Sequence, residues 1–592
     1  MRSTQRHLRP NATRRARIAA IGFAFACAVA AAATLAQAGL NTGFDIWDFM
    51  AVALIALTTA WLAWGAAQAF LGLPALEPLP ALTLDHTDFP ATAILVPVCN
   101  ENPVELYARL VAMRHSMQAE ALPVDFIVLS DTYDPAALKL ERLALAPLFS
   151  DATAPNRFFY RNRKDRHGRK AGNVEDFIRN SGGAYEYVVI LDADSLMEGK
   201  TIQHLVARMQ LDPTLGLLQT LPQIFGASSM FGRAMQFAAS FHSAVFARGL
   251  ARLQGGSGPF WGHNAIVRVR ALAQCCALPE LSGPAPFGGT ILSHDYVEAA
   301  LLVRGGWRVE MDPRIGGSYE EGPDNLLAHA RRDRRWCQGN LQHIRLLGAP
   351  GLHGWSRFVF VQGIMAYLVS VAWGAFLVVS LLATATNSNP NYFPNAYQLF
   401  PVFPDDKTFQ IVALAFGIGG LLLLPKITIF IEAVTVGRAS GYGGASAALV
   451  SVLAEILLTA MIAPLMLMYQ GRAVFEVFAG KDGGWPATAR GEGRLSFGQS
   501  WRAGRWITLF GIGATALIYA VAPYLMLWLL PVSVPMSIAP ALISITSRPL
   551  ISTVFSTPHE RHTPPVIRAY RAALAQPSAE KELSYGTPPR PA

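Results

Sequence analysis

Long apolar runs lie near both ends of this 592-residue chain, and they limit the folds open to it more than any other feature. About 20 consecutive apolar residues are enough to cross a bilayer. Such runs cover residues 18–38 and 49–73, and others follow Phe358. Between them, residues 97–352 hold no long uncharged apolar run, and about 250 residues are enough for one sizeable α/β domain. We therefore expect a soluble domain between two groups of transmembrane helices.

The composition agrees with this division. With 52% hydrophobic residues and a mean hydropathy of +0.30, the chain is too apolar for a soluble protein and too charged for a purely membrane one. Its five cysteines form no CxxC pair and no metal-ligand spacing, which favours a reducing compartment without disulfides. The basic residues behind the net charge of +9 are dispersed, so we expect loops that face the cytoplasm and no nucleic-acid partner.

Charge also predicts the orientation of the first half. Residues 1–17 are rich in arginine and should stay in the cytoplasm. Residues 18–75 then form two transmembrane helices, which return the chain to the cytoplasm, where residues 90–350 form the soluble domain. An alternative is a signal peptide cleaved after Ala36-Gln37-Ala38. In that case the second helix would still deliver the domain to the cytoplasm.

The second half should cross the membrane several times. Residues 357–470 are predicted to form transmembrane helices, with a polar external loop at 387–407. Residues 506–547 form an outward helix and a short return. The tail, 548–592, is basic and Pro-rich, and it is predicted to be cytoplasmic and disordered.

The segment before the last crossing raises a problem of parity. Residues 471–505 carry six basic side chains and should be cytoplasmic. Both flanks of the apolar run 445–469 then lie on the same side, so this run cannot cross once. We expect it to be re-entrant or interfacial, with Glu455 in polar surroundings rather than in lipid.

Within the soluble domain, carboxylates occur in a telling order. Asp192 and Asp194 directly follow the apolar run 187–191, and two residues one apart at a strand end point the same way. This pair suits a divalent cation, which in turn suits a diphosphate. A separate Asp295 is then free to act as a base, and the basic-aromatic pair Arg335-Trp336 follows. A lone DxD is also compatible with a solvated turn.

Other polar residues follow predicted strands. Asn100 and Glu101 come after strand 92–98, and Asp131 comes after strand 125–129. A third strand is predicted at 158–160. Polar residues at strand ends, with helices between, indicate the ligand edge of an open parallel α/β sheet.

Three further positions are candidates for the pocket. Lys170 opens the sequence Lys-Ala-Gly-Asn, which suits a phosphate or ribose contact, although a solvated loop that starts a helix has the same pattern. Trp261 and His263 lie in a loop that we interpret as part of the pocket wall, as we do residues 219–223. His263 is also compatible with a structural, hydrogen-bonded histidine.

Together these motifs resemble the processive membrane glycosyltransferases of family 2, the group of cellulose and hyaluronan synthases. The closest resemblance is to the glucosyltransferases of osmoregulated periplasmic glucans. It rests on residues 169–173, 261–265, 292–300, 317–321 and 332–343. Two positions depart from the wider group: Arg332 stands where a Gln is usual, and Ser293-His294 stands where the base motif has Thr-Glu.

The resemblance implies a fold and a reaction. The fold is a GT-A type α/β nucleotide-sugar-binding domain inserted in a helical transmembrane bundle. The reaction is inverting transfer of glucose from UDP-glucose to the β-1,2 backbone of a growing glucan, with export across the bacterial inner membrane. Residues 471–505 would form a cytoplasmic lid over the nucleotide, with Gly480, Gly483 and Gly484 as its flexible points.

The resemblance also implies roles for the candidate residues. Asp295 would be the catalytic base, and Asp192 and Asp194 would hold Mg²⁺ or Mn²⁺. The expected donor-binding residues are Asn100, Glu101, Asp131, Lys170, Asp192 and Arg335. The expected acceptor-binding residues are Trp261, His263 and Trp336, the last of which could instead anchor the domain at the membrane interface.

The implied partners are UDP-glucose, the growing glucan chain, the lipid bilayer, acyl carrier protein and periplasmic glucan-processing proteins. Two other readings remain. The first is another β-glycan synthase, making a cellulose- or chitin-like polymer, and the His294 and Arg332 variants argue against it. The second is a transporter or receptor with an inactive transferase domain, and the retention of every acidic motif position argues against that.

Overall fold

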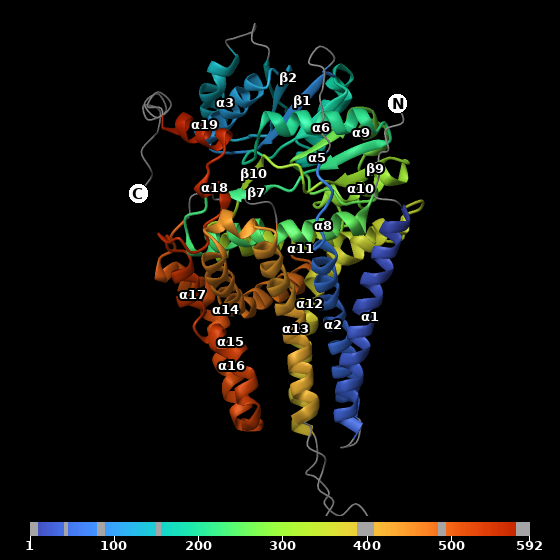
Figure 1. Ribbon diagram of the computed structural model, residues 1–592, viewed down its shortest axis with the longest axis vertical. Helices are drawn as coiled ribbons and strands as arrows, with labels where there is room; N and C mark the ends of the chain where they lie inside the picture. The colour runs from blue at the N-terminus through green and yellow to red at the C-terminus, as the bar shows by residue number, and fades with distance from the viewer. Residues whose placement is uncertain are drawn as a thin grey trace, which may run out of the picture.

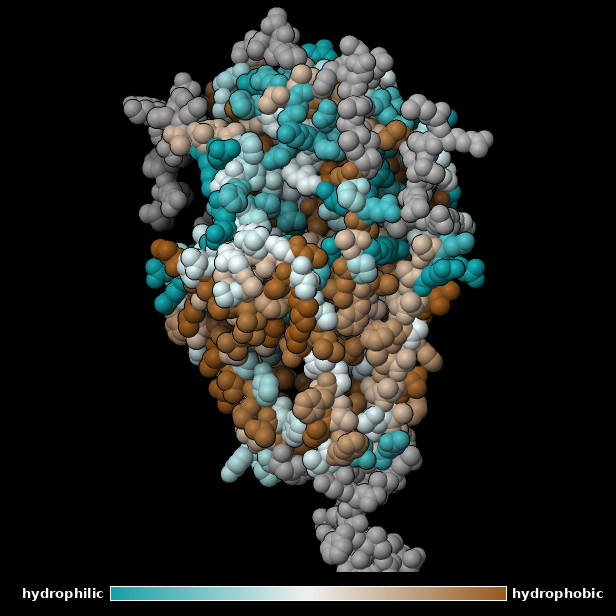
Figure 2. Space-filling view, in the orientation of Figure 1, coloured by the Kyte–Doolittle hydropathy of each residue, from teal (hydrophilic) through white to brown (hydrophobic). Residues whose placement is uncertain are grey.

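The computed structural model describes residues 10–40, 45–79, 89–149, 156–386, 408–483 and 493–575. A mixed α/β domain stands on a bundle of long helices (Figure 1). Hydropathy divides at the same level, because polar residues cover the upper domain and apolar residues cover the helices below it (Figure 2). The molecule thus has the two parts that the apolar runs predict.

Seven strands form the main sheet, in the order β3-β2-β1-β4-β8-β6-β9. They are β1 (Thr92–Val98), β2 (Val124–Ser130), β3 (Phe158–Asn162), β4 (Tyr187–Ile190), β6 (Leu215–Gln219), β8 (Ala265–Arg268) and β9 (Arg308–Met311). The four strands predicted from the sequence pair in parallel. The predicted open parallel sheet is thus confirmed for these strands, but the whole sheet is mixed, because β8 runs antiparallel to both β4 and β6. Ala265, the first residue of β8, pairs with Ile190 at the carboxyl end of β4, so β8 starts at the ligand edge and runs back.

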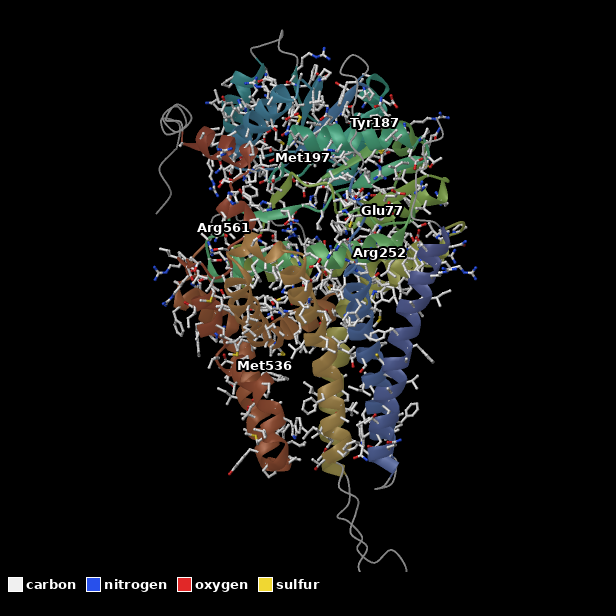
Figure 3. All side chains as sticks on the ribbon, viewed as in Figure 1. Glu77, Tyr187, Met197, Arg252, Met536 and Arg561 are labelled. Atoms are coloured by element: carbon white, nitrogen blue, oxygen red, sulfur yellow. The ribbon has the colours of Figure 1, made fainter. Side chains whose placement is uncertain are left out.

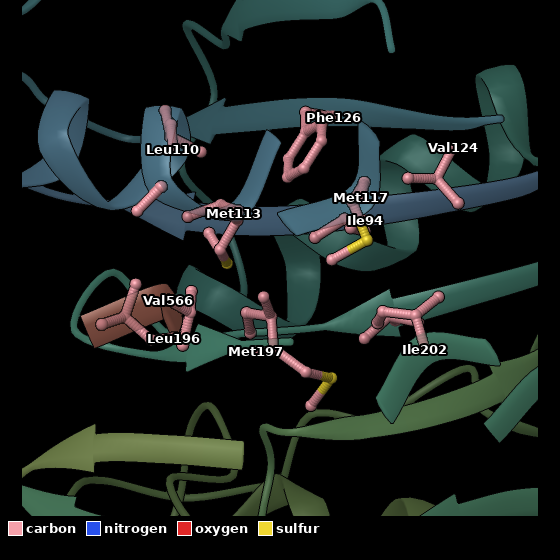
Figure 4. Packing of buried hydrophobic residues seen from close by; sticks show 14 of the residues in the cluster. Ile94, Leu110, Met113, Met117, Val124, Phe126, Leu196, Met197, Ile202 and Val566 are labelled. Carbon is pink, nitrogen blue, oxygen red and sulfur yellow. The ribbon is translucent and has the colours of Figure 1, made fainter. Parts of the chain in front are cut away.

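The central strands are buried on both faces, and their side chains alternate between two cores. Ile94 and Val96 of β1 pack with helices α3 (Pro103–Ala119) and α6 (Gly199–Leu211). Leu95 packs on the opposite face with α5 (Arg169–Ser181), α9 (Val269–Cys275) and α10 (His294–Arg304). Figure 4 shows Ile94 and Phe126 in the first core. Full burial of one such side chain contributes about 1.5–3 kcal/mol, so the two cores fix where β1, β2 and β4 end.

A second, small sheet lies below the first. Its strands are β5 (Leu196–Met197), β10 (Ser318–Glu321) and β7 (Gln223–Phe225), in that order. β5 starts two residues after Asp194, and β10 carries Glu320 and Glu321. This sheet therefore brings two more carboxylates next to residues 192–195, which we call the acidic turn.

Three helices run across the junction between the domain and the helices below it (Figure 1). They are α7 (Met230–Phe241), α8 (Ser243–Gln254) and α11 (Leu326–Gln342). Arg252 of α8, labelled in Figure 3, donates to the carbonyl oxygens of Pro74 and Ala75 at 2.9 and 3.1 Å. A Cβ on Gly72 would lie 1.9 Å from the Val245 oxygen, so α8 and α2 (Ile46–Gly72) approach backbone to backbone. We call α7, α8 and α11 the interfacial helices.

In the described part of the chain, six helices are long and apolar enough to cross a membrane. They are α1 (Pro10–Leu40), α2 (Ile46–Gly72), α12 (Gly354–Thr386), α13 (Thr408–Thr435), α14 (Ala445–Phe478) and α15 (Phe497–Val521). The pair α16 (Met526–Ser537) and α17 (Ala539–Thr546) is bent by 60° and would make a seventh span. Gly511 and Gly504 of α15 lie against Met536 and Pro540, so this pair returns along α15. The predicted external loop 387–407 lies outside the described residues.

Helix α14 passes the length and hydropathy test, yet its packing follows the interfacial helices. Val452 packs with Phe237 of α7, and Ile462 packs with Leu326 at the start of α11. Val477, near its end, packs with Cys337 of α11. Figure 1 shows α14 in the upper half of the helical part, above the lower ends of α1, α2 and α13. Both ends of α14 therefore lie against the same layer of helices.

Glu455 lies in polar surroundings, although it belongs to an apolar helix. Lys426 Nζ of α13 lies 2.6 Å from Glu455 Oε2, and His242 Nε2 lies 3.6 Å from the same oxygen. Glu455 is 3% exposed. A carboxylate buried to this degree is stable only with partners of this kind, and Lys426 supplies the opposite charge.

The prediction of a disordered tail is wrong for residues 548–575, and residues 576–592 lie outside the described part. α18 (Pro558–Arg561) and α19 (Pro565–Leu574) follow the last membrane helix. Val566, Tyr570 and Ala573 of α19 are buried against the domain, at a spacing that places them on one helix face. The prolines that suggested disorder instead start α18 and α19, because proline is favoured in the first turn.

Candidate active site

The acidic turn after β4 rests on a buried polar network. The Asp192 N–H donates to Ser195 Oγ at 3.2 Å, and Ser195 Oγ donates to Asn264 Oδ1 at 2.6 Å. Asn264 Nδ2 in turn donates to Ser318 Oγ at 2.8 Å. Ser195, Asn264 and Ser318 are fully buried, so the network fixes the turn against β8 and β10.

Lys170 joins the acidic turn to the loop before β8. Its Nζ contacts Asp192 Oδ1 and donates to the Gly262 carbonyl oxygen at 2.8 Å. Burial favours the neutral form of Asp192, but the charges of Lys170 and His263 outweigh it and hold the pKa of this carboxyl well below its usual range. Asp192 is therefore ionised at every physiological pH, and Lys170 lies at the ligand edge as predicted.

Asp295 lies beside this pair, in the first turn of α10. Gly262 has φ +85°, and a Cβ at this position would lie 3.6 Å from Asp295 Oδ2. The loop thus passes directly over the carboxyl, and its glycine leaves the space open. Burial raises the pKa of Asp295, and His294 opposes this shift. Asp295 is a partly buried carboxylate whose basicity is raised, as a general base requires.

His294 and Glu298 form a charged pair behind Asp295. His294 Nδ1 lies 3.2 Å from Glu298 Oε1, one turn further along α10. Burial alone would lower the pKa of His294, but Glu298 outweighs it and the pKa is raised. Glu298 therefore favours the protonated form of the unusual His294 of the base motif, next to Asp295. The sequence pattern did not assign a role to Glu298.

His263 lies between a buried amide and a carboxylate. Its Nδ1 is 3.0 Å from Asn264 Oδ1, and its Nε2 is 3.5 Å from Glu320 Oε2. Its side chain is 12% exposed. These contacts fit the structural reading of His263 better than direct contact with an acceptor. Trp261 belongs to the same loop. Its backbone N–H donates to Gln219 Oε1 at 3.2 Å, which holds the loop in place.

The nucleotide side of the predicted site is organised by Arg163. This guanidinium binds both oxygens of Asp131, at 2.7 and 2.9 Å. Asn173 Nδ2 donates to Asp131 Oδ1 at 3.0 Å. Asn100 has φ +56°, and its buried Oδ1 has no hydrogen-bond partner among the described residues. Such an unpaired acceptor next to a strand end is suited to a donor group of a ligand.

On the opposite side, helix α11 presents Trp336, which is 42% exposed. The Arg332 guanidinium lies over the Trp336 ring, with Cζ 4.4 Å from the ring centroid. Arg334 instead donates to the Lys481 carbonyl oxygen at 2.9 Å, and Gln338 Nε2 donates to Asp482 Oδ1 at 2.8 Å. The predicted lid, 471–505, is not a loop throughout, because residues 471–478 belong to α14 and residues 497–505 to α15. Its residues 481–482 lie on α11 near Trp336, and its residues 484–492 lie outside the described part.

The acidic turn faces a third carboxylate, that of Glu320. Burial raises the pKa of Glu320, and Asp194 and Asp192 raise it further, whereas His263 and Arg332 oppose them. Three carboxylates therefore act on one another across a small space. Among the described residues, no group of three or more His, Cys, Asp or Glu side chains could hold a metal ion by itself. A cation at Asp194 and Asp192 would need further oxygens from a ligand, as a diphosphate supplies.

Several residues of the site had no predicted role. They are Arg109, Arg163, Glu298, Glu320, Glu321 and Arg332. Glu320 and Glu321 lie in one of the motifs that carry the family resemblance, so a signal existed for them. Arg163 lies 32 residues from Asp131, and Arg109 lies 84 residues from Ala193, so no local pattern marks these contacts.

Comparison with known proteins places these residues in a family. Residues 93–275 match "Glycosyl transferase family 2", and residues 187–423 match "Glycosyl transferase family group 2". The chain is 51% identical, over 94% of each chain, to the glucans biosynthesis glucosyltransferase H of Cereibacter sphaeroides. It is 39% identical to that of Rhodopseudomonas palustris, over 89% of this chain and 76% of the relative.

Among solved structures, a mannosyltransferase from Pyrobaculum calidifontis, in complex with GDP-Man and Mn²⁺, has a TM-score of 0.44 and 17% identity. The match covers 74% of this chain and all of that one. The soluble domain has the GT-A type of fold, a mixed sheet with helices on both faces. From the close relatives and the two family matches, the chain belongs to the glucans biosynthesis glucosyltransferase H group of glycosyltransferase family 2.

Proposed function

We propose that the protein transfers glucosyl units from UDP-glucose to a growing glucan, with inversion, and so builds the β-1,2 backbone of osmoregulated periplasmic glucans. The observation that carries this proposal is the placement of Asp295. It is the carboxylate of raised basicity beside the Lys170–Asp192 pair and the acidic turn. The relatives are glucans biosynthesis glucosyltransferases, which supports glucan synthesis as the process.

On the donor side, the ligand edge offers charges for a nucleoside diphosphate. Lys170 supplies a point charge where the diphosphate would lie, and Asp192 holds Lys170 in place. Asp131, fixed by Arg163, and the unpaired Oδ1 of Asn100 would face the nucleoside. Glu101 follows Asn100 in the same turn, and Arg335 would contact a phosphate from the side of α11.

The chemical step needs one base. An acceptor hydroxyl oxygen forms a bond to the anomeric carbon, the bond from that carbon to the UDP oxygen breaks, and the hydroxyl proton passes to Asp295. A single direct displacement inverts the anomeric centre, so an α-linked donor yields a β-linked product. Glu298 favours the protonated form of His294, and the charge of that form would favour the ionised form of Asp295 before each transfer.

Asp194, with Asp192, would hold Mg²⁺ or Mn²⁺ against the diphosphate. When bound, such an ion offsets the negative charge that develops on the leaving UDP. The neighbouring Glu320 adds negative charge to the same space. Lys170 supplies the complementary charge from the protein.

The acceptor would stack on Trp336, whose exposed ring faces out of α11. Arg332 lies over one face of this ring, in the position where the wider group has a glutamine. Trp261 would line the same pocket from the loop above Asp295. We retain His263 only as a support for this loop, because its contacts are to Asn264 and Glu320.

We further propose that the domain lies in the cytoplasm and the helices in the bacterial inner membrane. The packing of both ends of α14 against the interfacial helices supports a segment that does not cross. The tail packs on the domain, so both lie on the same side of the membrane. This supports an even number of membrane crossings from the start of α15 to the tail. Export of the glucan through the helical part, and contacts with acyl carrier protein and periplasmic glucan-processing proteins, belong to the same proposal.

The test is a donor panel with purified protein in lipid nanodiscs. We expect UDP release and polymer formation with UDP-glucose, and little with UDP-N-acetylglucosamine, UDP-galactose or GDP-mannose. Methylation analysis of the polymer should give 2-linked glucose. A 4-linked product would favour a cellulose-like synthase, and no transfer from any donor would refute an active transferase.

A further inference from the structure

The guanidinium of Arg109 is buried directly behind the acidic turn. Arg109 is 2% exposed and lies on α3. Its Nη1 donates to the carbonyl oxygen of Ala193 at 3.3 Å, and Ala193 is the residue between the two aspartates. Its Nη2 lies 2.7 Å from Glu321 Oε1 and 3.1 Å from Glu105 Oε2. One cation thus connects α3, the acidic turn and β10.

The fourth contact of this cation comes from the tail. Arg109 Nη2 donates to Tyr570 Oη at 3.1 Å, and Tyr570 Oη donates to Glu321 Oε1 at 3.3 Å. The guanidinium also lies over the Tyr570 ring, 5.0 Å from its centroid. Arg109 and Tyr570 are 461 residues apart in the chain. The tail therefore completes a buried charge network whose other end is the backbone of the acidic turn.

The rest of the tail is held along the same route. Val566 and Tyr570 are buried in the core that contains Leu196, which directly follows the acidic turn. Figure 4 shows Val566 beside Leu196. Figure 1 shows α19 beside α3. Before α19, Glu560 pairs with Arg233 of α7 at 2.8 Å, and the His559 ring lies 5.2 Å from that of Tyr319 in β10.

We propose that the C-terminal segment 558–574 is a positioning element of the active site. Tyr570 fixes the Arg109 guanidinium, Arg109 fixes the Ala193 carbonyl and Glu321, and these fix the directions of the Asp192 and Asp194 carboxylates. The inference rests on the proposed function, because it assigns the acidic turn to the metal and diphosphate. In chain order the segment follows every membrane helix described, so the turn reaches its final geometry only when the tail has docked.

The geometry separates this role from ordinary packing. Apolar side chains alone would be enough to cover the core between α3 and the tail. The hydroxyl of Tyr570 instead contacts the buried guanidinium of Arg109, which donates a hydrogen bond to the Ala193 carbonyl oxygen of the acidic turn. Loss of the hydroxyl should leave the helix docked and loosen the turn.

The main experiment compares two variants in full-length protein in nanodiscs. Tyr570→Phe keeps the ring and removes the hydroxyl. Tyr185→Phe is the matched control, because its hydroxyl donates to Asp125 Oδ2 at 2.9 Å near the opposite edge of the sheet. The midpoint temperature of thermal unfolding should fall by a similar amount in both variants. Tyr570→Phe removes the hydrogen bonds of the hydroxyl to Arg109 and Glu321, and Arg109 in turn contacts the acidic turn. The Mn²⁺ concentration for half-maximal turnover should therefore rise about 3- to 10-fold in Tyr570→Phe only.

A second measurement uses the tail itself. A chain truncated after Thr557 should lose at least about tenfold in kcat. A synthetic peptide of residues 556–576 should restore part of it, and the same peptide with Tyr570→Phe should restore less. The inference is overturned if Tyr570→Phe and Tyr185→Phe have the same metal response while Asp194→Asn still abolishes turnover. If Asp194→Asn keeps the ordinary metal response, the proposed metal site fails instead.

Discussion

Replacement of Asp295 by asparagine should separate activity from stability. The change keeps the size of the side chain and removes its charge and basicity. Burial raises the pKa of Asp295 in the folded protein. At a pH above the pKa of this residue in the unfolded chain, the ionised carboxylate therefore lowers the free energy of unfolding. The variant has no such charge to bury. Its midpoint temperature of thermal unfolding at neutral pH should therefore be equal to or slightly above that of the wild type.

Turnover should change in the opposite direction. Removal of a general base costs about 10²- to 10⁴-fold in rate, which corresponds to about 2.7–5.4 kcal/mol of transition-state stabilisation. UDP binding should be nearly unchanged, because Lys170 and Asp192 remain paired. The assay is steady-state UDP release with UDP-glucose, together with calorimetric UDP binding and thermal unfolding in nanodiscs.

The control is Asp324→Asn, since burial also raises the pKa of Asp324, which lies outside the proposed site. This variant should turn over at close to the wild-type rate. If Asp295→Asn instead lost UDP binding, Asp295 would belong to the nucleotide pocket, and a near-normal rate would exclude it as the base.

Three further predictions concern metal, pH and topology. Asp194→Asn should abolish divalent-dependent turnover, and a normal Mg²⁺ titration of the variant would contradict the metal assignment. The pKa of His294 is raised in the folded protein, so the ion pair with Glu298 contributes its full stability at a pH below the pKa of this histidine in the unfolded chain. This contribution is lost as the pH rises through the pKa of His294 in the folded protein. Glu298→Gln should therefore shift the alkaline limb of the kcat profile to lower pH, and an unchanged limb would exclude this pair. A cysteine in Gly483→Cys should resist an impermeant reagent on intact cells and react in inverted vesicles, with UDP and Mg²⁺ slowing the reaction; labelling from outside would refute both the lid and a non-crossing α14.

Local patterns in the sequence predicted most of the ligand edge. The strands before Asn100, Asp131 and Asp192 are continuous apolar runs, and side chains that follow parallel strands meet at one edge. Lys170 could be placed there because it opens the helix that leads into the next strand. What the pattern could not give was the direction of β8, because four residues carry no signal of strand direction.

Long-range pairing accounts for the rest. Arg163 and Arg109 are basic residues in ordinary positions of a loop and a helix, and only the fold brings them to Asp131 and to Ala193. The tail was misread because composition is a weak guide in a short segment. Its prolines begin two helices, and α19 has four buried positions in ten residues, too few to stand out in a basic stretch.

The most direct test of the central claim is the configuration of the bond that the enzyme makes. Purified protein in nanodiscs is given UDP-glucose with ¹³C at the anomeric carbon, and the polymer is examined by NMR. Transfer to a single acceptor hydroxyl with Asp295 as the only base predicts that every labelled linkage is β and joins position 2, and that Asp295→Asn yields almost no labelled polymer. Labelled α-linkages, or label incorporated at a wild-type rate by Asp295→Asn, would contradict the account.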